Sequence, residues 1–426
     1  MSINNGLAPT PPLGWNSWDC YGTSVREDEV KANALYMAEN LAKFGWQYIV
    51  VDIQWYEPEA RAGGYRPNAF LIMDEYSRLL PASNRFPSAA SGQGFKPLAD
   101  FVHCLGLKFG IHIMRGIPRQ AVRQNSAIFD TPYREADIAD QSSTCPWNDD
   151  MFGLDMSHPG AQAYYNSIIA LYASWGVDYI KTDDINWPYR AAEIEGIAAA
   201  IKKSGRPIVL SLSPGNAGAG PDQLAHLKSH CELSRISDDL WDRWVDIKAQ
   251  FELCRRWAAA GGPGYWPDAD MLPLGRISIR GERGPDRQSL LTHDEQTTLM
   301  TLWSIFRSPL MMGGDLPSND AFTLGLLTNA EVLRVNQHSQ GNRELFHKNN
   351  QIAWVADGPD GCKYLAFFNL EDNATASINV DLFETFGAAG WRVRDLWQET
   401  DLGLLEGKFG QNIPSHGAGL YALYPV

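Results

Sequence analysis

Apolar and polar positions follow two repeating patterns along the first part of the chain. Short apolar runs rich in β-branched residues, such as residues 47–53 and 107–114, each follow a longer amphipathic stretch, such as residues 28–45 and 95–106. The short runs are typical of buried strands, and the longer stretches have the period of helices. We predict eight strands, within residues 11–18, 47–53, 107–114, 177–183, 207–213, 230–239, 264–271 and 308–315.

The order of these elements predicts how the strands pair. Strands and helices that alternate at this spacing form parallel strands joined by right-handed crossovers. Several helical stretches end in a glycine just before the next strand, as expected of a helix C-cap in such a connection. These glycines are Gly45, Gly106, Gly176 and Gly205. Eight units of this kind predict an α/β fold, a (β/α)8 TIM barrel over residues 1–335.

The pattern changes after residue 335. Helical periodicity gives way to short apolar runs that are separated by turn residues, such as the GPDG at residues 358–361. These runs lie at residues 352–358, 363–370, 375–382, 391–397 and 419–426. They predict a small antiparallel β-sandwich domain over residues 336–426.

Polar residues gather where the predicted barrel strands end. The carboxyl ends of barrel strands share one face of the fold, and the active sites of TIM barrels lie there. A single aspartate after a strand often caps a helix instead. Several carboxylates at one place repel one another and lose solvation, which favours a ligand-binding role for the group. The residues concerned are Trp15, Asn16, Asp52, His112, Asp183, Ser213, Arg235, Asp239, Asp268 and Asp270.

Two pairs within this group suggest chemistry. Lys181 precedes Asp183 by two residues, so both side chains lie on one side of a strand and the ammonium can keep the carboxylate ionised. Asp239 lies at another strand end, four residues after Arg235. An ionised carboxylate that faces a protonatable one is the arrangement used for glycoside hydrolysis. Two structural salt bridges are the alternative interpretation. We interpret His112 as a hydrogen-bonding wall residue rather than a metal ligand, because no second histidine lies at ligand spacing from it.

Charge and composition narrow the range of partners. The 426 residues include 36 basic and 50 acidic side chains, a formal net charge of −14. Nucleic acid or an anionic membrane would require a concentrated basic patch, so we expect neither as a partner. We find no signal peptide and no membrane-spanning run, and the six cysteines are scattered. We therefore expect a cytoplasmic protein with reduced thiols, and a homo-oligomer is compatible with the sequence.

Five segments carry a resemblance to a known family: PPLGWNSWDCYG, YIVVDIQW, VDYIKTD, RISDDLWDRW and PDADML, in this order. They resemble the signature segments of glycoside hydrolase family 27, the α-galactosidase and α-N-acetylgalactosaminidase family. The resemblance implies a retaining enzyme that acts on a carbohydrate without a metal or organic cofactor. By motif, Asp183 corresponds to the nucleophile and Asp239 to the acid/base. The sugar contacts correspond to Trp15, Asp52, Lys181, Arg235 and Asp270.

The chain departs from the family pattern around the expected sugar site. Where α-galactosidases have two adjacent aspartates that grip the O4 and O6 side of galactose, this chain has Asp52 and Ile53. His112 replaces a tyrosine. Ser213 and Gly215 stand where α-galactosidases have CEWP near the sugar C2. Small residues there resemble the N-acetylgalactosaminidase version, which needs room for an acetamido group.

Ile53 is the most informative departure. β-L-Arabinopyranose is α-D-galactopyranose without its C6 hydroxymethyl group, so a branched hydrocarbon here is expected to fill the vacated volume. We therefore predict an exo-acting hydrolase of α-galactoside-configured pyranosides that favours β-L-arabinopyranosides. α-Galactosidase and α-N-acetylgalactosaminidase activity are alternatives, and so is a purely structural role for Ile53 in the core. A non-catalytic carbohydrate-binding barrel and a metal-dependent sugar isomerase are the alternatives from other classes.

Overall fold

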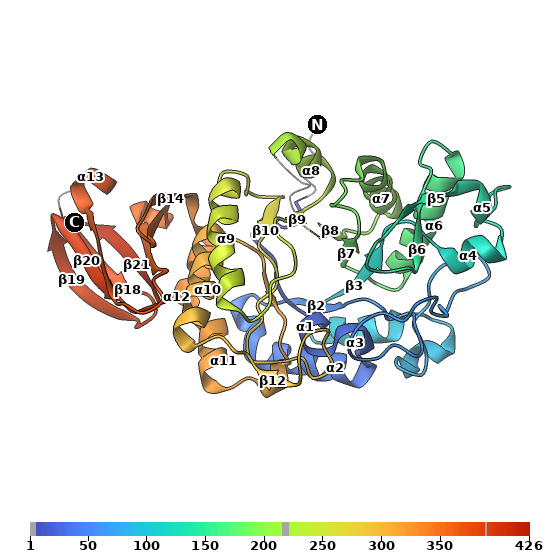
Figure 1. The fold of residues 1–426 in the computed structure, drawn as a ribbon, viewed down its shortest axis with the longest axis horizontal. Helices are drawn as coiled ribbons and strands as arrows, with labels where there is room; N and C mark the ends of the chain where they lie inside the picture. Colours follow the sequence, from blue (N-terminus) through green and yellow to red (C-terminus); the bar gives the residue numbers. More distant parts are fainter. Residues whose placement is uncertain (1–5, 215–220, 388–389) are drawn as a thin grey trace.

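The computed structural model describes residues 6–214, 221–387 and 390–426 (Figure 1). Its larger sheet contains β1 (Leu13–Asn16), β2 (Tyr48–Val51), β3 (Lys108–Met114), β7 (Tyr179–Asp183), β8 (Val209–Leu212), β9 (Leu233–Arg235), β10 (Trp266–Asp268) and β13 (Leu310–Met312). The strands are parallel and lie in the order β10, β9, β8, β7, β3, β2, β1, β13. A parallel bridge between Leu272 and Met312 connects the segment after β10 with β13, so the sheet curls round on itself. Each predicted strand is present, and the predicted barrel is confirmed.

Helices cover the outside of this sheet. The four glycines predicted to end helices all have positive φ: 98° at Gly45, 76° at Gly106, 90° at Gly176 and 73° at Gly205. This conformation costs glycine little, which is why the chain can turn directly from helix to strand there. The helices are α1 (Trp18–Tyr21), α2 (Glu27–Tyr36), α3 (Lys96–Cys104), α6 (Pro159–Ser174), α7 (Ala191–Ser204), α8 (Leu224–His230), α9 (Trp244–Trp257), α10 (His293–Phe306), α11 (Ala321–Thr328) and α12 (Ala330–His338).

Two insertions interrupt the barrel, and the apolar pattern did not predict either. The first lies between β3 and α6 and contains β4 (Ile117–Pro118), α4 (Arg119–Gln124), α5 (Glu135–Ile138), β5 (Ala139–Thr144) and β6 (Met151–Leu154). Its strands pair in the order β4, β6, β5. The second is the antiparallel pair β11 (Arg276–Ile277) and β12 (Arg287–Gln288). Both insertions bring residues to the candidate site described below.

The C-terminal part is an antiparallel sandwich. Its strands are β14 (Gln340–Lys348), β15 (Gln351–Asp357), β16 (Lys363–Asn369), β17 (Ala376–Asp381), β18 (Gly390–Asp395), β19 (Thr400–Glu406), β20 (Lys408–Ile413) and β21 (Ala418–Pro425), with the short helix α13 (Leu382–Phe386). One sheet has the order β14, β15, β16, β21, β18, β19, and the other pairs β17 with β20. Five of these strands were predicted. β14, β19 and β20 were not, because they carry no continuous apolar run.

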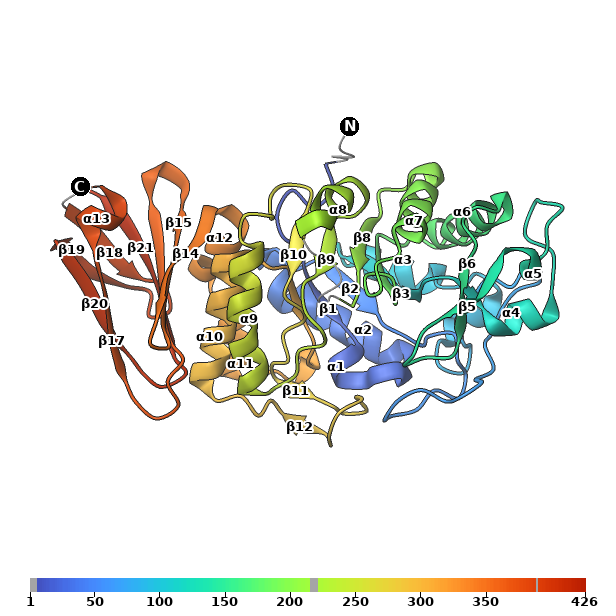
Figure 2. The same cartoon turned by 45° about the horizontal axis from the view of Figure 1, so that its top comes forward.

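The central strands β15, β16 and β21 of the six-stranded sheet are buried on both faces. Leu365 and Phe367 point into the sandwich core, where Phe367 packs against Phe409. On the opposite face Phe368 packs against Phe251 of α9, with ring centroids 5.0 Å apart. Figure 2 shows the sandwich beside α10 and α12. The sandwich therefore packs against the barrel through the helices that follow its last strands.

The division of the chain after residue 335 stays a prediction; α12 crosses it, and β14 begins at Gln340. Within the described ranges, none of the helices combines the length and the apolar character that crossing a bilayer requires.

Candidate functional site

The candidate site is a cavity of about 850 Å³ at the carboxyl ends of the barrel strands. Five residues predicted for the site line this cavity: Asp52, Ile53, Lys181, Asp183 and Asp239. The remaining strand-end residues named from the sequence are buried and are not among the lining residues: Trp15, Asn16, His112, Ser213, Arg235, Asp268 and Asp270. Side chains from β7 and from the segments after β2 and β9 thus meet in one place.

Asp183 ends β7 and lies beside His112 of the neighbouring strand β3. His112 Nε2 is 3.2 Å from Asp183 Oδ2, and the backbone N–H of Asp184 donates to Asp183 Oδ1 at 2.8 Å. Burial raises the pKa of Asp183, but the hydrogen bond and charge of His112 and the charge of Lys181 outweigh it, so the pKa lies below its ordinary value. Asp183 is therefore ionised at neutral pH.

Lys181 makes its direct ion pair with Asp52 rather than with Asp183. Its Nζ lies 2.9 Å from Asp52 Oδ2, which also accepts a hydrogen bond from Asn16 Nδ2 at 2.7 Å. Burial raises the pKa of Asp52, yet the charges of Lys181 and His112 and the two hydrogen bonds lower it to about 2. Lys181 donates its hydrogen bond to Asp52, so it favours ionised Asp183 only through the positive charge of its ammonium group.

Arg235, the last residue of β9, connects two carboxylates. Its Nη2 lies 3.2 Å from Asp239 Oδ1, and its Nη1 lies 2.7 Å from Asp270 Oδ1. Asp270 is buried and also accepts the backbone N–H of Leu240 at 2.6 Å. The Asp239 side chain is 41% exposed, so it can exchange protons with the cavity.

Trp15 and Ser213 lie in the barrel wall. Trp15 Nε1 donates to the carbonyl of Gly314 at 2.9 Å, and the backbone N–H of Ser213 donates to the carbonyl of Thr182 at 2.8 Å. Pro214, the residue after Ser213, lines the cavity. Gly215, the second small residue considered near the sugar C2, lies outside the described residues. Sugar contact by Trp15 and Ser213 stays a prediction.

Ile53 lines the cavity and packs in the apolar core at the same time. Its side chain is almost completely buried, at 2% exposure. β2 ends at Val51, so Asp52 and Ile53 both follow the strand, and the alternation of strand side chains does not separate them. Residue 53 can therefore shape the cavity beside Asp52.

Sequence reasoning missed an aromatic wall. Trp18 stacks on Tyr65 with ring centroids 6.1 Å apart, and Tyr65 packs against Trp147 at 5.4 Å. All three line the cavity, together with Trp187 and Glu282. Flat apolar sugar faces pack on such rings. The 15 tryptophans of the chain were a general signal for this property, but the rings come from separate loops, so no local motif identifies them.

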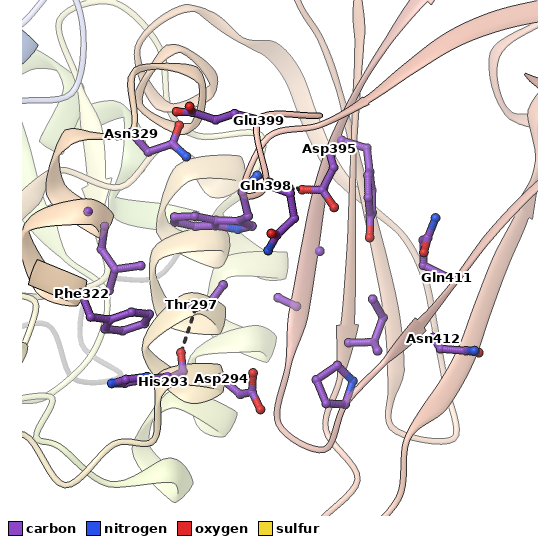
Figure 3. A pocket seen from close by; sticks show the side chains of 18 of the residues that line it. His293, Asp294, Thr297, Phe322, Asn329, Asp395, Gln398, Glu399, Gln411 and Asn412 are labelled. Carbon is purple, nitrogen blue, oxygen red and sulfur yellow. Dashed lines mark hydrogen bonds between the residues drawn. The ribbon is translucent and has the colours of Figure 1, made fainter. Parts of the chain in front are cut away.

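A second cavity of about 760 Å³ lies between α10, α11 and the sandwich (Figure 3). The rings of His293 and Phe322 stack there at 3.8 Å, and Asp395 and Gln398 lie on the sandwich side. Trp397 also lines this cavity. None of the predicted site residues lines it. The chemistry predicted from the sequence therefore belongs to the cavity in the barrel.

Comparison with known proteins identifies the family. Family models described as alpha galactosidase A and alpha galactosidase C-terminal beta sandwich domain match residues 147–338 and 348–423. The crystal structure of a GH27 β-L-arabinopyranosidase from Geobacillus stearothermophilus is 52% identical, with a TM-score of 0.97, and the match covers 100% of this chain and 99% of that one. This chain belongs to glycoside hydrolase family 27. The resemblance seen in the five sequence segments is confirmed, and the protein is a glycoside hydrolase.

The names of similar proteins point to different substrates. An aspartate-to-alanine variant of the Geobacillus enzyme in complex with arabinose is 51% identical, with a TM-score of 0.97 and 100% coverage of both chains. Alpha-galactosidase 3 of Arabidopsis thaliana is 28% identical and covers 100% of this chain and 84% of its own length. Human alpha-N-acetylgalactosaminidase is 26% identical, with 100% and 94% covered. Family membership alone therefore leaves the substrate open.

Proposed function

We propose that the protein is a retaining, exo-acting hydrolase that prefers terminal β-L-arabinopyranosides over α-D-galactosides and N-acetyl-α-D-galactosaminides. The observation that carries this proposal is the position of Ile53, which lines the cavity next to Asp52. The 52% identity to a β-L-arabinopyranosidase supports it.

Asp183 is assigned as the nucleophile. It lines the cavity and is kept ionised by His112 and by the backbone N–H of Asp184. In the first step one carboxylate oxygen attacks the anomeric carbon and forms a glycosyl ester, while the bond to the leaving oxygen breaks. Both oxygens of Asp183 have a hydrogen-bond partner in the free enzyme, so the carboxylate is held in position before the sugar binds.

Asp239 is assigned as the acid/base. It lines the same cavity from a different strand end, and its exposure lets it exchange a proton with water between steps. Its carboxyl protonates the leaving oxygen in the first step. Its carboxylate then takes a proton from the water that attacks the ester, and the sugar leaves with its original anomeric configuration. Arg235 holds Asp239 and Asp270 and so orients the acid/base.

Asp52 and Ile53 are assigned to substrate selection. Three donors already fix Asp52: Lys181, Asn16 and the backbone N–H of Ile53. A carboxylate has about four acceptor positions, which leaves one for a sugar hydroxyl. Ile53 presents hydrocarbon where galactose carries its hydroxymethyl group, so galactose would leave one hydroxyl crowded and without a partner.

The test is a panel of three nitrophenyl glycosides: the β-L-arabinopyranoside, the α-D-galactoside and the N-acetyl-α-D-galactosaminide. We expect kcat/KM to be highest for the arabinoside. Preference for either of the other two would overturn the proposed specificity. Absence of hydrolysis on all three would favour a carbohydrate-binding barrel, and loss of activity after exhaustive chelation would favour a metal-dependent reaction.

Stereochemistry tests the mechanism separately from the specificity. In a retaining enzyme the two carboxyl groups lie roughly 5 to 5.5 Å apart, so that one can attack the anomeric carbon directly. Proton NMR of the arabinoside reaction should show the β-anomer of the free sugar first, before mutarotation. If the α-anomer forms first, water attacks directly, and the assignment of Asp183 as nucleophile is wrong.

A further inference from the structure

Two histidines and a glutamate form a cluster on the outside of the barrel, where α7 and α8 are neighbours (Figure 1). His226 and His230 are four residues apart on α8, so both project from one face of that helix. Glu195 projects from α7, and one potential ligand atom of each residue lies within 4.8 Å of the others. From the sequence we considered only His112 among the histidines as a metal ligand, and the family resemblance implied no metal. His226 and His230 are a histidine pair at ligand spacing that lies apart from His112.

Hydrogen bonds already orient both imidazole rings. His230 Nδ1 lies 2.7 Å from the carbonyl oxygen of His226. A carbonyl can only accept, so Nδ1 carries the hydrogen, and Nε2 of the neutral ring keeps a free electron pair. His226 Nδ1 lies 2.5 Å from the hydroxyl of Tyr189, while its Nε2 lies 3.1 Å from Glu195 Oε1. Histidines that bind metals characteristically have the second ring nitrogen bonded in this way.

We propose that Glu195, His226 and His230 bind one divalent transition-metal ion of the zinc type. Two imidazole nitrogens and one carboxylate oxygen form a three-ligand set that suits zinc, with water as the fourth ligand. Ligand atoms about 2 Å from a tetrahedral ion lie roughly 3.3 Å apart. The 3.1 Å between His226 Nε2 and Glu195 Oε1 is close to this separation. On binding, His226 changes tautomer, so that Nε2 faces the ion and Nδ1–H donates to Tyr189.

The position of the cluster gives the ion a structural consequence for the catalytic cavity. Tyr189 directly follows Trp187 and Pro188, which line that cavity. An ion held by α7 and α8 would fix His226, and through it Tyr189, and would thus brace the segment that carries Trp187. The metal takes no part in glycoside hydrolysis. It ties one wall of the cavity to two helices of the barrel.

The test is zinc binding by isothermal titration calorimetry, using full-length protein without a histidine tag, after treatment with a chelator. We expect one zinc ion per chain. His230→Gln removes a ligand and should weaken binding by more than about 100-fold, since even loss of an outer hydrogen bond typically costs 10- to 100-fold. Tyr189→Phe, which removes only such an outer bond, should weaken binding by roughly 10- to 100-fold. His347→Gln, at an exposed histidine of β14, should leave binding unchanged.

A thermal measurement gives the second readout. Zinc at roughly 100 times its Kd should raise the Tm of the wild type and of His347→Gln by about 3 °C, and should leave His230→Gln unchanged. Should His230→Gln fail to fold, Glu195→Gln at an exposed position of α7 takes its place, because it removes the charged ligand without disturbing the core. Unchanged zinc affinity in His230→Gln or in its substitute Glu195→Gln, or no binding by the wild type at 1 mM zinc, would show that the cluster is only a hydrogen-bonded network. Either result would overturn the proposal.

Discussion

The backbone N–H of Ile53 donates a hydrogen bond to Oδ1 of the Asp52 carboxylate, 2.9 Å away. This bond lies in the segment that follows β2 and fixes the orientation of the Asp52 carboxylate beside Ile53 at the cavity. Carboxylate and hydrocarbon thereby present opposite chemistry to neighbouring parts of the cavity. Within a strand, successive side chains point to opposite faces, so a residue next to Asp52 would point away from the site. Ile53 can line the cavity beside Asp52 because β2 has already ended at Val51.

Replacement of His112 by leucine should move the acidic limb of the kcat/KM profile to higher pH. The hydrogen bond from His112 lowers the pKa of Asp183, so loss of this bond raises that pKa. At a given acidic pH a larger fraction of the variant then has Asp183 protonated, and a protonated carboxyl group cannot act as the nucleophile. His112→Gln keeps a donor and should move the limb less. The pH profile of each folded variant checks this, and an unshifted limb in His112→Leu would contradict the role given to His112.

Loss of the ion pair between Lys181 and Asp52 should destabilise the protein most at neutral pH. Lys181→Met leaves a buried carboxylate without its cation, a change that costs about 3 to 5 kcal/mol. The folded pKa of Asp52 is about 2, below its unfolded value of about 3.8, so the pair stabilises the wild type above pH 4 and stops doing so as pH falls towards 2. The difference in unfolding free energy between wild type and variant should therefore shrink as the pH is lowered from 7 to 3.

Chemical denaturation at several pH values measures this difference. Lys202→Met, at an exposed lysine of α7, is the matched control and should change the unfolding free energy by less than about 0.5 kcal/mol at every pH. A gap between wild type and Lys181→Met that stays constant down to pH 3 would mean that the lysine acts through packing rather than through its charge.

The barrel could be predicted from the sequence because its signals are local. Each strand is a short apolar run, and a helix C-cap is visible as a single glycine, as at Gly45 and Gly205. The first insertion carries no such signal: five of the six residues of β5, Ala139–Thr144, are partly or fully exposed. Edge strands such as β19 were missed for the same reason.

Partner choice within the site could not be predicted. Lys181 lies two residues from Asp183 and 129 from Asp52, yet it bonds to Asp52 because β2 and β7 both flank β3 and their ends face one cavity. The aromatic wall has the same origin, since Trp18, Tyr65 and Trp147 meet only after three separate segments have folded. Residue types at strand ends indicate a site, whereas contacts across the barrel need the structure.

Removal of the acid/base should affect poor leaving groups most. Asp239→Ala should lower kcat/KM by about 10²- to 10⁴-fold on alkyl glycosides, which need protonation, and much less on activated aryl glycosides. Azide should restore turnover on activated substrates by attacking the glycosyl ester in place of activated water. Asp100→Ala, at an exposed aspartate of α3, should behave as the wild type. Equal losses on all leaving groups without azide rescue would exclude Asp239 as the acid/base.

Substitution of Ile53 decides whether this residue selects the substrate. Ile53→Asp removes the hydrocarbon and supplies an acceptor for the galactose O6 hydroxyl, so it should shift the ratio of arabinoside to galactoside kcat/KM towards galactoside. One charge-assisted hydrogen bond and the relieved crowding together are worth about 2 to 4 kcal/mol, a change of roughly 30- to 1000-fold in the ratio. Ile53→Ala relieves the crowding without adding an acceptor and should shift the ratio by a smaller factor. A residue that only fills the core would instead give variants of lower Tm with the wild-type ratio. The ratio is therefore measured on folded protein, where loss of stability affects both substrates equally and cancels.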